Sequence, residues 1–312
     1  MRPTVSINLC CYNSKKYLRE TLDSIVRQTY KDWELIIVND GSFDSTESII
    51  QEYIEQGYPL VYRYQENRGL SYSRNKALEL SQGDYIALID HDDLWLDDSL
   101  KKLVDGIESD SYAVCYGGVQ FIDKHGKKIK NYIPKYHSGY IFDRLLKYID
   151  IYVPAVIIRK SVIDSCALRF DENLKTSEDV AFFLELAVDH SYFVLHQIIS
   201  QYRIHDDSLT SASISRWAYE REHTLNLLFN RYPQTREKFR DVYKQAYAKV
   251  SYYHARYYMY KGKRGEARKE MKKVLFTNYK YFVLFICLYF PDMFWNFAHK
   301  LRYHRSVFSE KL

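Results

Sequence analysis

The chain is organised around the stretch Gly83–Asp93, whose sequence is GDYIALIDHDD. Residues 85–89 form a short apolar run preceded by turn residues, which predicts a buried strand. Three carboxylates follow within four residues. Carboxylates repel one another unless a cation neutralises them, and open α/β sheets bind ligands beyond the carboxyl ends of their strands. The pattern therefore favours a Mg²⁺ or Mn²⁺ that grips a diphosphate, and a solvated acidic turn is the alternative.

Strands and helices alternate before this stretch. Apolar runs predict strands, and apolar residues at helical spacing predict helices, in the alternating order 5–9, 17–26, 35–38, 49–54, 60–64 and 70–80. Such alternation indicates βαβ units and a parallel sheet. The glycine patterns of dinucleotide sites and P-loops are missing from the sequence, so neither of these sites is expected.

The rest of the chain has a different pattern. Strands are predicted at 112–122 and 152–159, with a mobile loop rich in Lys, Tyr and Gly at 124–140. Beyond residue 212 the pattern is helical, and 235–274 is similar to one tetratricopeptide-type hairpin. No second copy of that hairpin is evident, so a repeat array is not expected.

The cysteine content and the N-terminus indicate the cellular compartment. The five cysteines include no C-x-x-C pair, which argues against a disulfide framework and a zinc site and fits a reducing cytoplasm. The N-terminus runs into the first strand without a signal peptide. We therefore expect a cytoplasmic protein.

The net charge of +5 conceals an asymmetry. Residues 216–312 contain 21 Lys and Arg against 8 Asp and Glu, a balance of +13, whereas residues 1–215 contain 24 against 32, a balance of −8. The acidic front half argues against a nucleic acid partner. The basic, aromatic back end suits an anionic membrane surface.

Ten apolar or aromatic residues occupy Tyr281–Phe290. A membrane span needs about 20 residues, so this segment is too short to cross a bilayer. With the basic residues around it, the segment suits a helix lying in the membrane interface. A helix packed on the front half of the chain is the alternative.

Several motifs occur in a fixed order along the first half. Together they resemble the N-terminal half of a family 2 glycosyltransferase: Val5–Asn13, Gln28–Tyr30, Trp33–Ser42, Asn67–Gly69, Arg74–Asn75 and Gly83–Asp93. The resemblance covers about 1–210 and implies a GT-A fold, a Rossmann-like mixed sheet flanked by helices that binds a nucleotide sugar. We accordingly predict a catalytic domain at 1–212 and a helical, basic-aromatic C-terminal region at 213–312.

The resemblance implies an inverting, metal-dependent transfer of a sugar from a nucleotide diphosphate donor, with a UDP-sugar favoured. Asp90-His91-Asp92 then matches the D-x-D motif. In that role Asp92 is a ligand of Mn²⁺ or Mg²⁺, and Asp90 and His91 lie on the donor side. His205, in the Tyr202–Ser208 stretch, matches a position that contacts the metal or the diphosphate in that family. A surface histidine is the alternative for His205.

The resemblance also assigns the rest of the donor site. Cys11, Tyr12 and Asn13 form the turn after the first strand, where Tyr12 stacks on the base. Asp40 accepts a hydrogen bond from the uracil ring, and Arg74 contacts a phosphate or the sheet edge. The alternatives are a lid on the sheet edge for Tyr12, a turn former for Asp40 and an exposed helical charge for Arg74.

Two departures from the family pattern leave the identity of the nucleotide base in the donor less certain to assign from the sequence. Cys10-Cys11 stands in place of the usual Pro-Thr, and Asn39 replaces the first Asp of a common Asp-Asp pair.

Ser177 and the two acidic residues after it predict a helix start, at which acidic residues usually complement the helix dipole. In the family, Glu178-Asp179 matches a Glu-Asp motif, which makes Asp179 the catalytic base. The resemblance and the basic tail imply an acceptor that is a bacterial surface glycan or an undecaprenyl-linked saccharide. They place the protein peripherally on the cytoplasmic face of the inner membrane. A sugar-phosphate nucleotidyltransferase and a non-catalytic glycan-binding scaffold are the alternatives.

Overall fold

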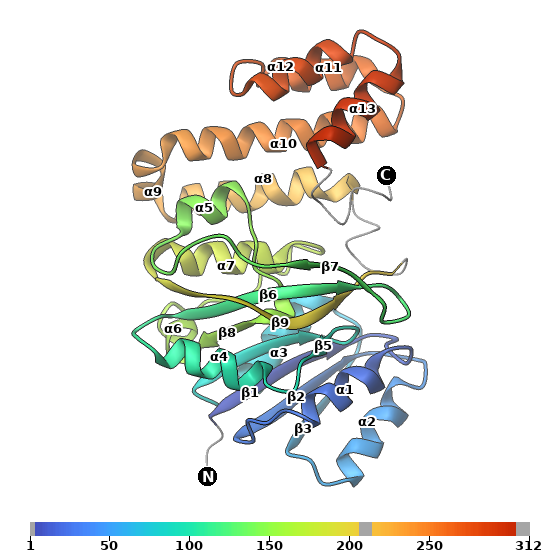
Figure 1. Ribbon diagram of the computed structural model, residues 1–312, viewed down its shortest axis with the longest axis vertical. Coiled ribbons are helices and arrows are strands. Elements are labelled where there is room, and N and C mark those ends of the chain that lie inside the picture. The colour runs from blue at the N-terminus through green and yellow to red at the C-terminus, as the bar shows by residue number, and fades with distance from the viewer. Residues whose placement is uncertain (1–3, 206–213, 304–312) are drawn as a thin grey trace. The chain divides into compact units, whose positions relative to one another are not determined.

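A computed structural model describes residues 4–205 and 214–303 of the chain, with the side chains of 214–215 and 299–303 excepted (Figure 1). The chain divides into two compact units, Met1–His205 and Asp206–Leu312. The domain boundary predicted between 212 and 213 falls in the segment 206–213, outside the described residues.

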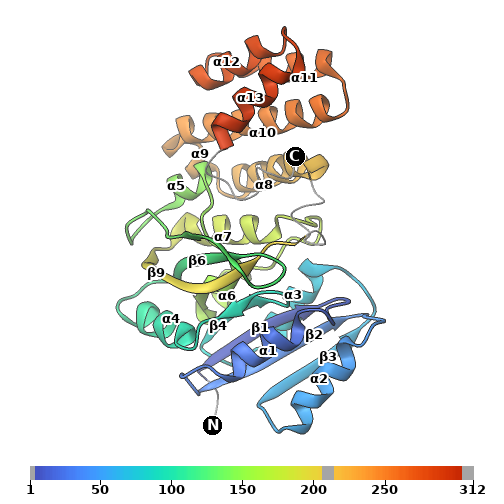
Figure 2. The same ribbon diagram turned by 45° about the vertical axis from the view of Figure 1, so that its right-hand side comes forward.

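The first unit is built on one sheet of nine strands, in the order β3-β2-β1-β4-β8-β6-β9-β5 with β7 paired to β6 (Figures 1 and 2). The strands are β1 Val5–Cys11, β2 Trp33–Asp40, β3 Leu60–Gln65, β4 Tyr85–Asp90, β5 Leu94–Trp95, β6 Val114–Ile122, β7 Lys128–Tyr132, β8 Val156–Arg159 and β9 Tyr192–Arg203. This sheet confirms the predicted mixed α/β fold.

The front half of the sheet is parallel, as the alternating pattern predicted. β1 lies between β2 and β4, and β2 also pairs with β3. The helices between these strands are α1 Leu18–Val26, α2 Thr46–Glu55 and α3 Leu70–Leu80. β2 is buried along its whole length, and on one face Ile36 and Val38 pack with Ala77 of α3. Strands covered on both faces need continuous apolar runs, which explains why the sequence signal was clear.

The register of these strands positions the site. Cys10 pairs with Asp90 and Cys11 with Asn39, so β1, β2 and β4 end at the same level. The residues that follow these strands therefore gather at one edge of the sheet.

The back half is mixed. β8 runs antiparallel to both β4 and β6, whereas β6 and β9 are parallel. Its helices are α4 Ser99–Glu108, α5 Phe142–Lys147, the 3₁₀ helix η1 Val153–Ala155, α6 Lys160–Ser165 and α7 Glu178–Asp189.

Two local predictions were wrong. The predicted loop 124–140 contains β7, because the Asp123 carboxylate accepts the backbone N–H groups of His125 and Lys127 and closes a tight turn onto β6. The predicted strand 152–159 begins instead with η1, and Pro154 lies within this 3₁₀ turn.

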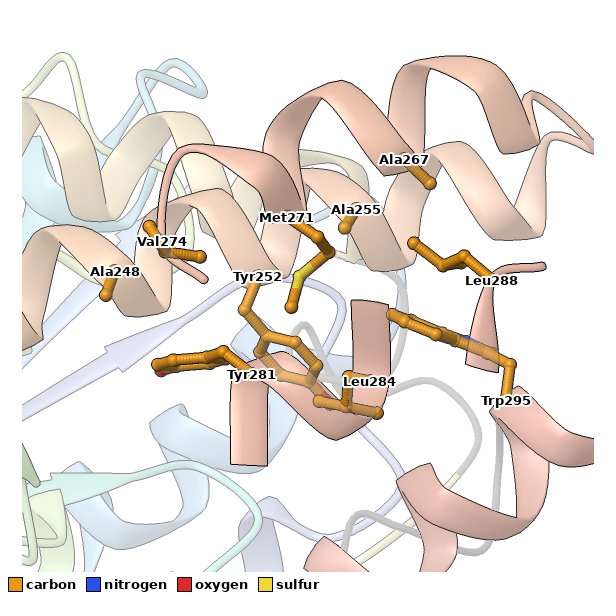
Figure 3. Packing of buried hydrophobic residues seen from close by; sticks show 10 residues of the cluster. All are labelled: Ala248, Tyr252, Ala255, Ala267, Met271, Val274, Tyr281, Leu284, Leu288 and Trp295. Atoms are coloured by element: carbon orange, nitrogen blue, oxygen red, sulfur yellow. The ribbon is translucent and has the colours of Figure 1, made fainter. Parts of the chain in front are cut away.

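The second unit is helical in its described residues. Its helices are α8 Ile214–Arg231, α9 Pro233–Lys238, α10 Arg240–Tyr260, α11 Arg264–Lys272, α12 Tyr279–Cys287 and α13 Asp292–Tyr303. α10 and α11 form the predicted hairpin, with Gly262 in the left-handed region at φ +69° between them. Tyr252, Met271 and Trp295 belong to the core that holds α10 to α13 together (Figure 3). Within 4–205 and 214–303, every helix is too short or too polar to cross a bilayer.

A buried carboxylate lies against the back half of the sheet, between α5 and η1. Asp150 is almost fully buried, and it accepts hydrogen bonds from the hydroxyls of Tyr116 at 3.2 Å and Tyr132 at 3.4 Å. Burial raises the pKa of Asp150 to about 6, and the two hydroxyls only partly offset this effect.

Replacing this carboxyl by an amide should change how stability depends on pH. The pKa of Asp150 is about 6 in the folded state and 3.8 in the unfolded state, so the folded protein holds this proton more tightly. The resulting stabilisation is complete below about pH 4 and is lost as the pH rises through 6. The always neutral variant Asp150→Asn should therefore gain on the wild type between pH 4 and pH 7, by up to about 3 kcal/mol of unfolding free energy. Urea denaturation across this range measures the difference. The exposed Asp105→Asn should show no such trend, and a flat difference for Asp150→Asn would contradict the prediction.

Candidate active site

A buried guanidinium joins the end of β4 to the start of α7. Arg74, on α3, is 5% exposed and donates to Asp90 Oδ1 at 2.7 Å and to Glu178 Oε1 at 2.6 Å. Burial opposes the charged form, but Asp90 and Glu178 raise the pKa of Arg74 above its ordinary value. The interpretation of Arg74 as an exposed helical charge is therefore wrong. Its predicted phosphate contact stays a prediction, with two of its donors already directed at carboxylates.

The two acidic residues that open α7 have different surroundings. Glu178 is buried, and burial raises its pKa while Arg74 opposes that rise. Asp179 keeps partial exposure, and its Oδ1 accepts the N–H of Val180 at 2.8 Å. Desolvation also raises the pKa of Asp179, against the opposing effect of Arg74. A carboxylate with a raised pKa is a better proton acceptor than an ordinary one.

Asp92 and His205 meet at the same edge of the sheet. His205 Nε2 lies 2.7 Å from Asp92 Oδ2, although the two residues are 113 positions apart. Burial by itself would raise the pKa of Asp92, but the hydrogen bond from His205 and the nearby charge of His91 lower it below its usual value. His91 is partly exposed, with Nδ1 4.0 Å from Asp92 Oδ1.

Arg203 fixes this arrangement from the end of β9. Its Nε donates to the backbone oxygen of Asp92 at 2.9 Å, and its backbone N–H donates to Asp93 Oδ1 at 2.8 Å. The guanidinium also lies over the ring of Tyr17, which in turn contacts the ring of His205. Asp93 is fully buried, so it supports the turn while Asp92 remains accessible.

Asp92 and His205 are the described residues that fit a divalent metal. Carboxylate oxygen and neutral imidazole are suitable donors for Mn²⁺, and Mg²⁺ is usually held by one or two carboxylates with substrate phosphates completing its shell. Among residues 4–205 and 214–303, three or more His, Cys, Asp or Glu side chains nowhere form a metal-binding group. Asp92 and His205 thus supply two donors that fit such an ion.

The loops after β1 and β2 are tied to each other. The N–H of Asn13 donates to Ser42 Oγ at 2.9 Å, and the N–H of Phe43 donates to Asn13 Oδ1 at 3.0 Å. Asn13 adopts a left-handed φ of +50° to make these contacts. Tyr12 is 46% and Phe43 83% exposed, and their rings meet edge to face at 6.2 Å between centroids. An exposed aromatic pair thus stands beside the strand ends.

Asp40 is committed to the loop that leads into α3. Its carboxylate accepts the backbone N–H groups of Arg68 at 2.9 Å and Gly69 at 2.8 Å, and Gln65 Nε2 at 2.7 Å. Neither sequence interpretation of Asp40 included this role, and its predicted contact with the uracil ring stays a prediction. The side chain of Cys11 is buried, so its predicted contact with the nucleotide would have to come from the backbone.

Sequence reasoning missed Phe43 and Arg203. Phe43 is a lone aromatic residue in a polar turn. Its sequence does not show that it is exposed beside Tyr12, which became evident only from the structure. Arg203 lies within the Tyr202–Ser208 stretch that identified His205, but its partners are distant in the sequence.

Removing the guanidinium of Arg74 should destabilise the first unit. In Arg74→Met two carboxylates at the site lose their cation, and breaking a buried pair costs about 3–5 kcal/mol of unfolding free energy. Urea denaturation at pH 7 measures the loss, and adding Glu178→Gln to this variant should recover part of it. The matched control is Arg19→Met, which breaks the exposed Arg19–Glu52 pair and should cost less than about 1 kcal/mol. Equal losses in the two arginine variants would show that Arg74 is not a structural clamp.

Comparison with known proteins places these features in context. The sequence model of Glycosyl transferase family 2 matches residues 6–166. A Bacillus subtilis protein described as the putative teichuronic acid biosynthesis glycosyltransferase TuaG is 31% identical over 228 residues, which cover 71% of this chain and 88% of the relative. An uncharacterized glycosyltransferase of Haemophilus influenzae is 31% identical over 232 residues, with 73% and 89% covered.

Two solved structures are similar in fold. The crystal structure of S. aureus TarS 1-349 in complex with UDP-GlcNAc superposes with a TM-score of 0.65 at 19% identity, covering 99% of this chain and 89% of that one. The mannosyltransferase PcManGT from Pyrobaculum calidifontis, in complex with GDP-Man and Mn2+, gives a TM-score of 0.57 at 15% identity, with 98% and 89% covered.

Proposed function

Because the chain belongs to glycosyl transferase family 2 and is a glycosyltransferase, we propose that it moves a sugar from a nucleoside diphosphate donor to a glycan or undecaprenyl-linked acceptor with inversion. Family membership selects glycosyl transfer over the nucleotidyltransferase and scaffold alternatives. TuaG, named for teichuronic acid biosynthesis, supports a cell-surface polysaccharide as the product.

The observation that carries the proposal is the bridge made by Arg74. One guanidinium holds Asp90, at the end of a parallel strand, and Glu178, next to the proposed base Asp179. This bridge supports the proposed roles of Asp90 on the donor side and Asp179 on the acceptor side, because one side chain holds both segments. A UDP-sugar is the favoured donor, since TarS, which has a similar fold, is known in complex with UDP-GlcNAc. The GDP-Man complex of PcManGT shows that this fold also takes another base.

Each residue then has a role in binding the donor. Tyr12 stacks on the base, and the turn around Asn13 and the loop fixed by Asp40 shape the pocket. Asp90 and His91 lie toward the ribose and sugar. Asp92 and His205 would hold Mn²⁺ or Mg²⁺, which when bound neutralises the diphosphate and makes it a better leaving group.

Asp179 is proposed to act on the acceptor. It takes the proton of the acceptor hydroxyl while that oxygen forms a bond to the anomeric carbon, and the bond from that carbon to the diphosphate breaks. The nucleoside diphosphate leaves, and the proton stays on Asp179. A single displacement inverts the carbon, so an α-linked donor gives a β-linked product.

We further propose that the protein is cytoplasmic and lies peripherally on the cytoplasmic face of the inner membrane, where a lipid-linked acceptor is presented. The charge balance of +13 in residues 216–312 supports this location.

The metal assignment predicts the behaviour of Asp92→Asn. The amide keeps the shape of the side chain but loses the charge that faces the cation, so metal-dependent release of nucleoside diphosphate should fall to background. Turnover with a panel of nucleotide sugars, titrated with Mn²⁺ and with Mg²⁺, is the measurement. The exposed Asp97→Asn should stay fully active. If the wild-type protein keeps its full turnover rate in excess chelator, the metal assignment is wrong.

The base assignment predicts that Asp179→Asn separates binding from turnover. Donor affinity, measured by calorimetry, should stay near that of the wild type, whereas kcat should fall by about 10²-fold or more. Asp189→Asn, at the exposed end of the same helix, is the matched control and should leave both values unchanged. If donor affinity collapses in Asp179→Asn, the residue binds the donor and another base is required.

A further inference from the structure

α12 is apolar on two opposite faces. Tyr281, Leu284 and Leu288 face inward and pack in the core with Tyr252 and Met271 (Figure 3). At 100° per residue, the side of the helix opposite to these carries Phe282, Val283 and Ile286, all of them exposed. A surface helix normally has polar residues on its outer face. The outer face of α12 therefore needs a partner.

Exposed apolar side chains also lie on both sides of α12 along the chain. Ten of the twenty large hydrophobic side chains that are exposed in the described residues lie between 276 and 297. Their exposed fractions run from 42% to 94%, and they are Phe276, Tyr279, Phe282, Val283, Ile286, Tyr289, Phe290, Met293, Phe294 and Phe297. Single exposed apolar residues are ordinary, but a concentration of this kind marks an interaction surface. We call these ten residues the α12–α13 face.

Basic groups flank the α12–α13 face. Arg268 donates to the backbone oxygen of Leu288 at 2.8 Å and 3.1 Å, and its guanidinium lies 4.2 Å from the ring centroid of Tyr289. Lys280 is exposed within α12, and Lys272 and Lys273 end the preceding segment. Residues 261–303 contain ten Lys and Arg against three Asp and Glu, a balance of +7.

The composition of the α12–α13 face selects one partner chemistry. Residues 276–297 hold a single acidic residue, Asp292, which pairs with Arg264. A second copy of this chain would bring two basic rims together, which is unfavourable. An anionic lipid surface instead supplies both the apolar phase for the phenylalanines and the negative charge for the rim. α12 and α13 have 9 and 12 residues, far below the roughly 20 of a span, so they would lie in the plane of the interface.

We propose that the α12–α13 face inserts into the headgroup region of an anionic membrane. This face would be the surface by which the protein associates with the membrane. The inference rests on the proposed function in one respect, namely that membrane binding gives access to a lipid-linked acceptor. The core around Tyr252 and Trp295 presents the face as a fixed structure. Residue by residue, Phe282, Ile286 and Phe290 contribute apolar burial, and Lys272, Lys273 and Lys280 contribute attraction to the lipid charge.

Co-sedimentation of the full-length protein with vesicles tests the proposal. The wild type should bind vesicles of phosphatidylglycerol and phosphatidylcholine at least tenfold more strongly than vesicles of phosphatidylcholine alone. Raising the salt concentration should weaken the binding, because exposed charges are screened. The triple variant Phe282→Ser, Ile286→Ser, Phe290→Ser should bind at least tenfold less to anionic vesicles. The triple variant Lys272→Gln, Lys273→Gln, Lys280→Gln should lose the preference for anionic lipid.

The matched control is Val61→Ser with Tyr64→Ser, which removes two exposed apolar residues from β3 in the first unit and should bind vesicles like the wild type. Thermal unfolding checks that each variant is folded. If the triple serine variant does not fold, the single variants Phe282→Ser and Ile286→Ser take its place. Unchanged vesicle binding in the serine variants would overturn the proposal. A dimer of the wild type that these variants convert to a monomer, with no lipid effect, would instead identify a second copy as the partner. Transfer to a soluble acceptor should occur in the wild type and persist in the serine variants. Its absence in the wild type would count against the proposed function and not against the membrane surface.

Discussion

The packing of α3 against the start of α7 depends on a buried cation. A guanidinium at 5% exposure can persist only if carboxylates compensate it, and Arg74 has one from β4 and one from α7. The neighbouring Asn75 binds both the N–H and the carbonyl of Phe170, whose ring stacks on Phe182 of α7 at 4.1 Å. α3 is thereby locked to the segment that leads into α7. The first turn of α7, and Asp179 with it, cannot shift without breaking charged and aromatic contacts together.

A second fixed point lies at the other side of the strand ends. Arg203 binds the backbone of Asp92, and its own backbone is held by Asp93. Glu20 of α1 accepts from the same guanidinium at 2.8 Å, so three elements meet on one side chain. Asp90 and Asp92 are therefore held by two different arginines. The turn from Asp90 to Asp92 is thus positioned without a ligand, and in the proposed donor site this would lower the cost of ordering it.

The parts of the fold that sequence predicted are those with local signals. α3 was predicted with the bounds that the structure gives and β4 to within one residue, because an apolar run and a helical spacing are both complete within a dozen residues. β7 was missed because its stability comes from pairing with β6 and from the Asp123 turn, neither of which shows in its own polar sequence. The partners of Arg74 at position 178 and of Asp40 at positions 68 and 69 were hidden for a similar reason. The sequence around a charged residue at a strand end or on a helix does not show whether its side chain will bind a ligand or another part of the protein.

The same limit applies to α12, whose sequence is apolar or aromatic at every position except Lys280. Only the packing of Tyr281, Leu284 and Leu288 into the core decides which face remains outside. The charge distribution then indicates which part of the chain an anionic surface attracts, which packing alone does not show. An anionic surface attracts the segment with a balance of +13 and repels the segment with a balance of −8, and both effects act within roughly 8–10 Å at physiological ionic strength. The charge of residues 216–312 therefore favours the proposed docking by the α12–α13 face, and the charge of residues 1–215 disfavours docking by the first part of the chain.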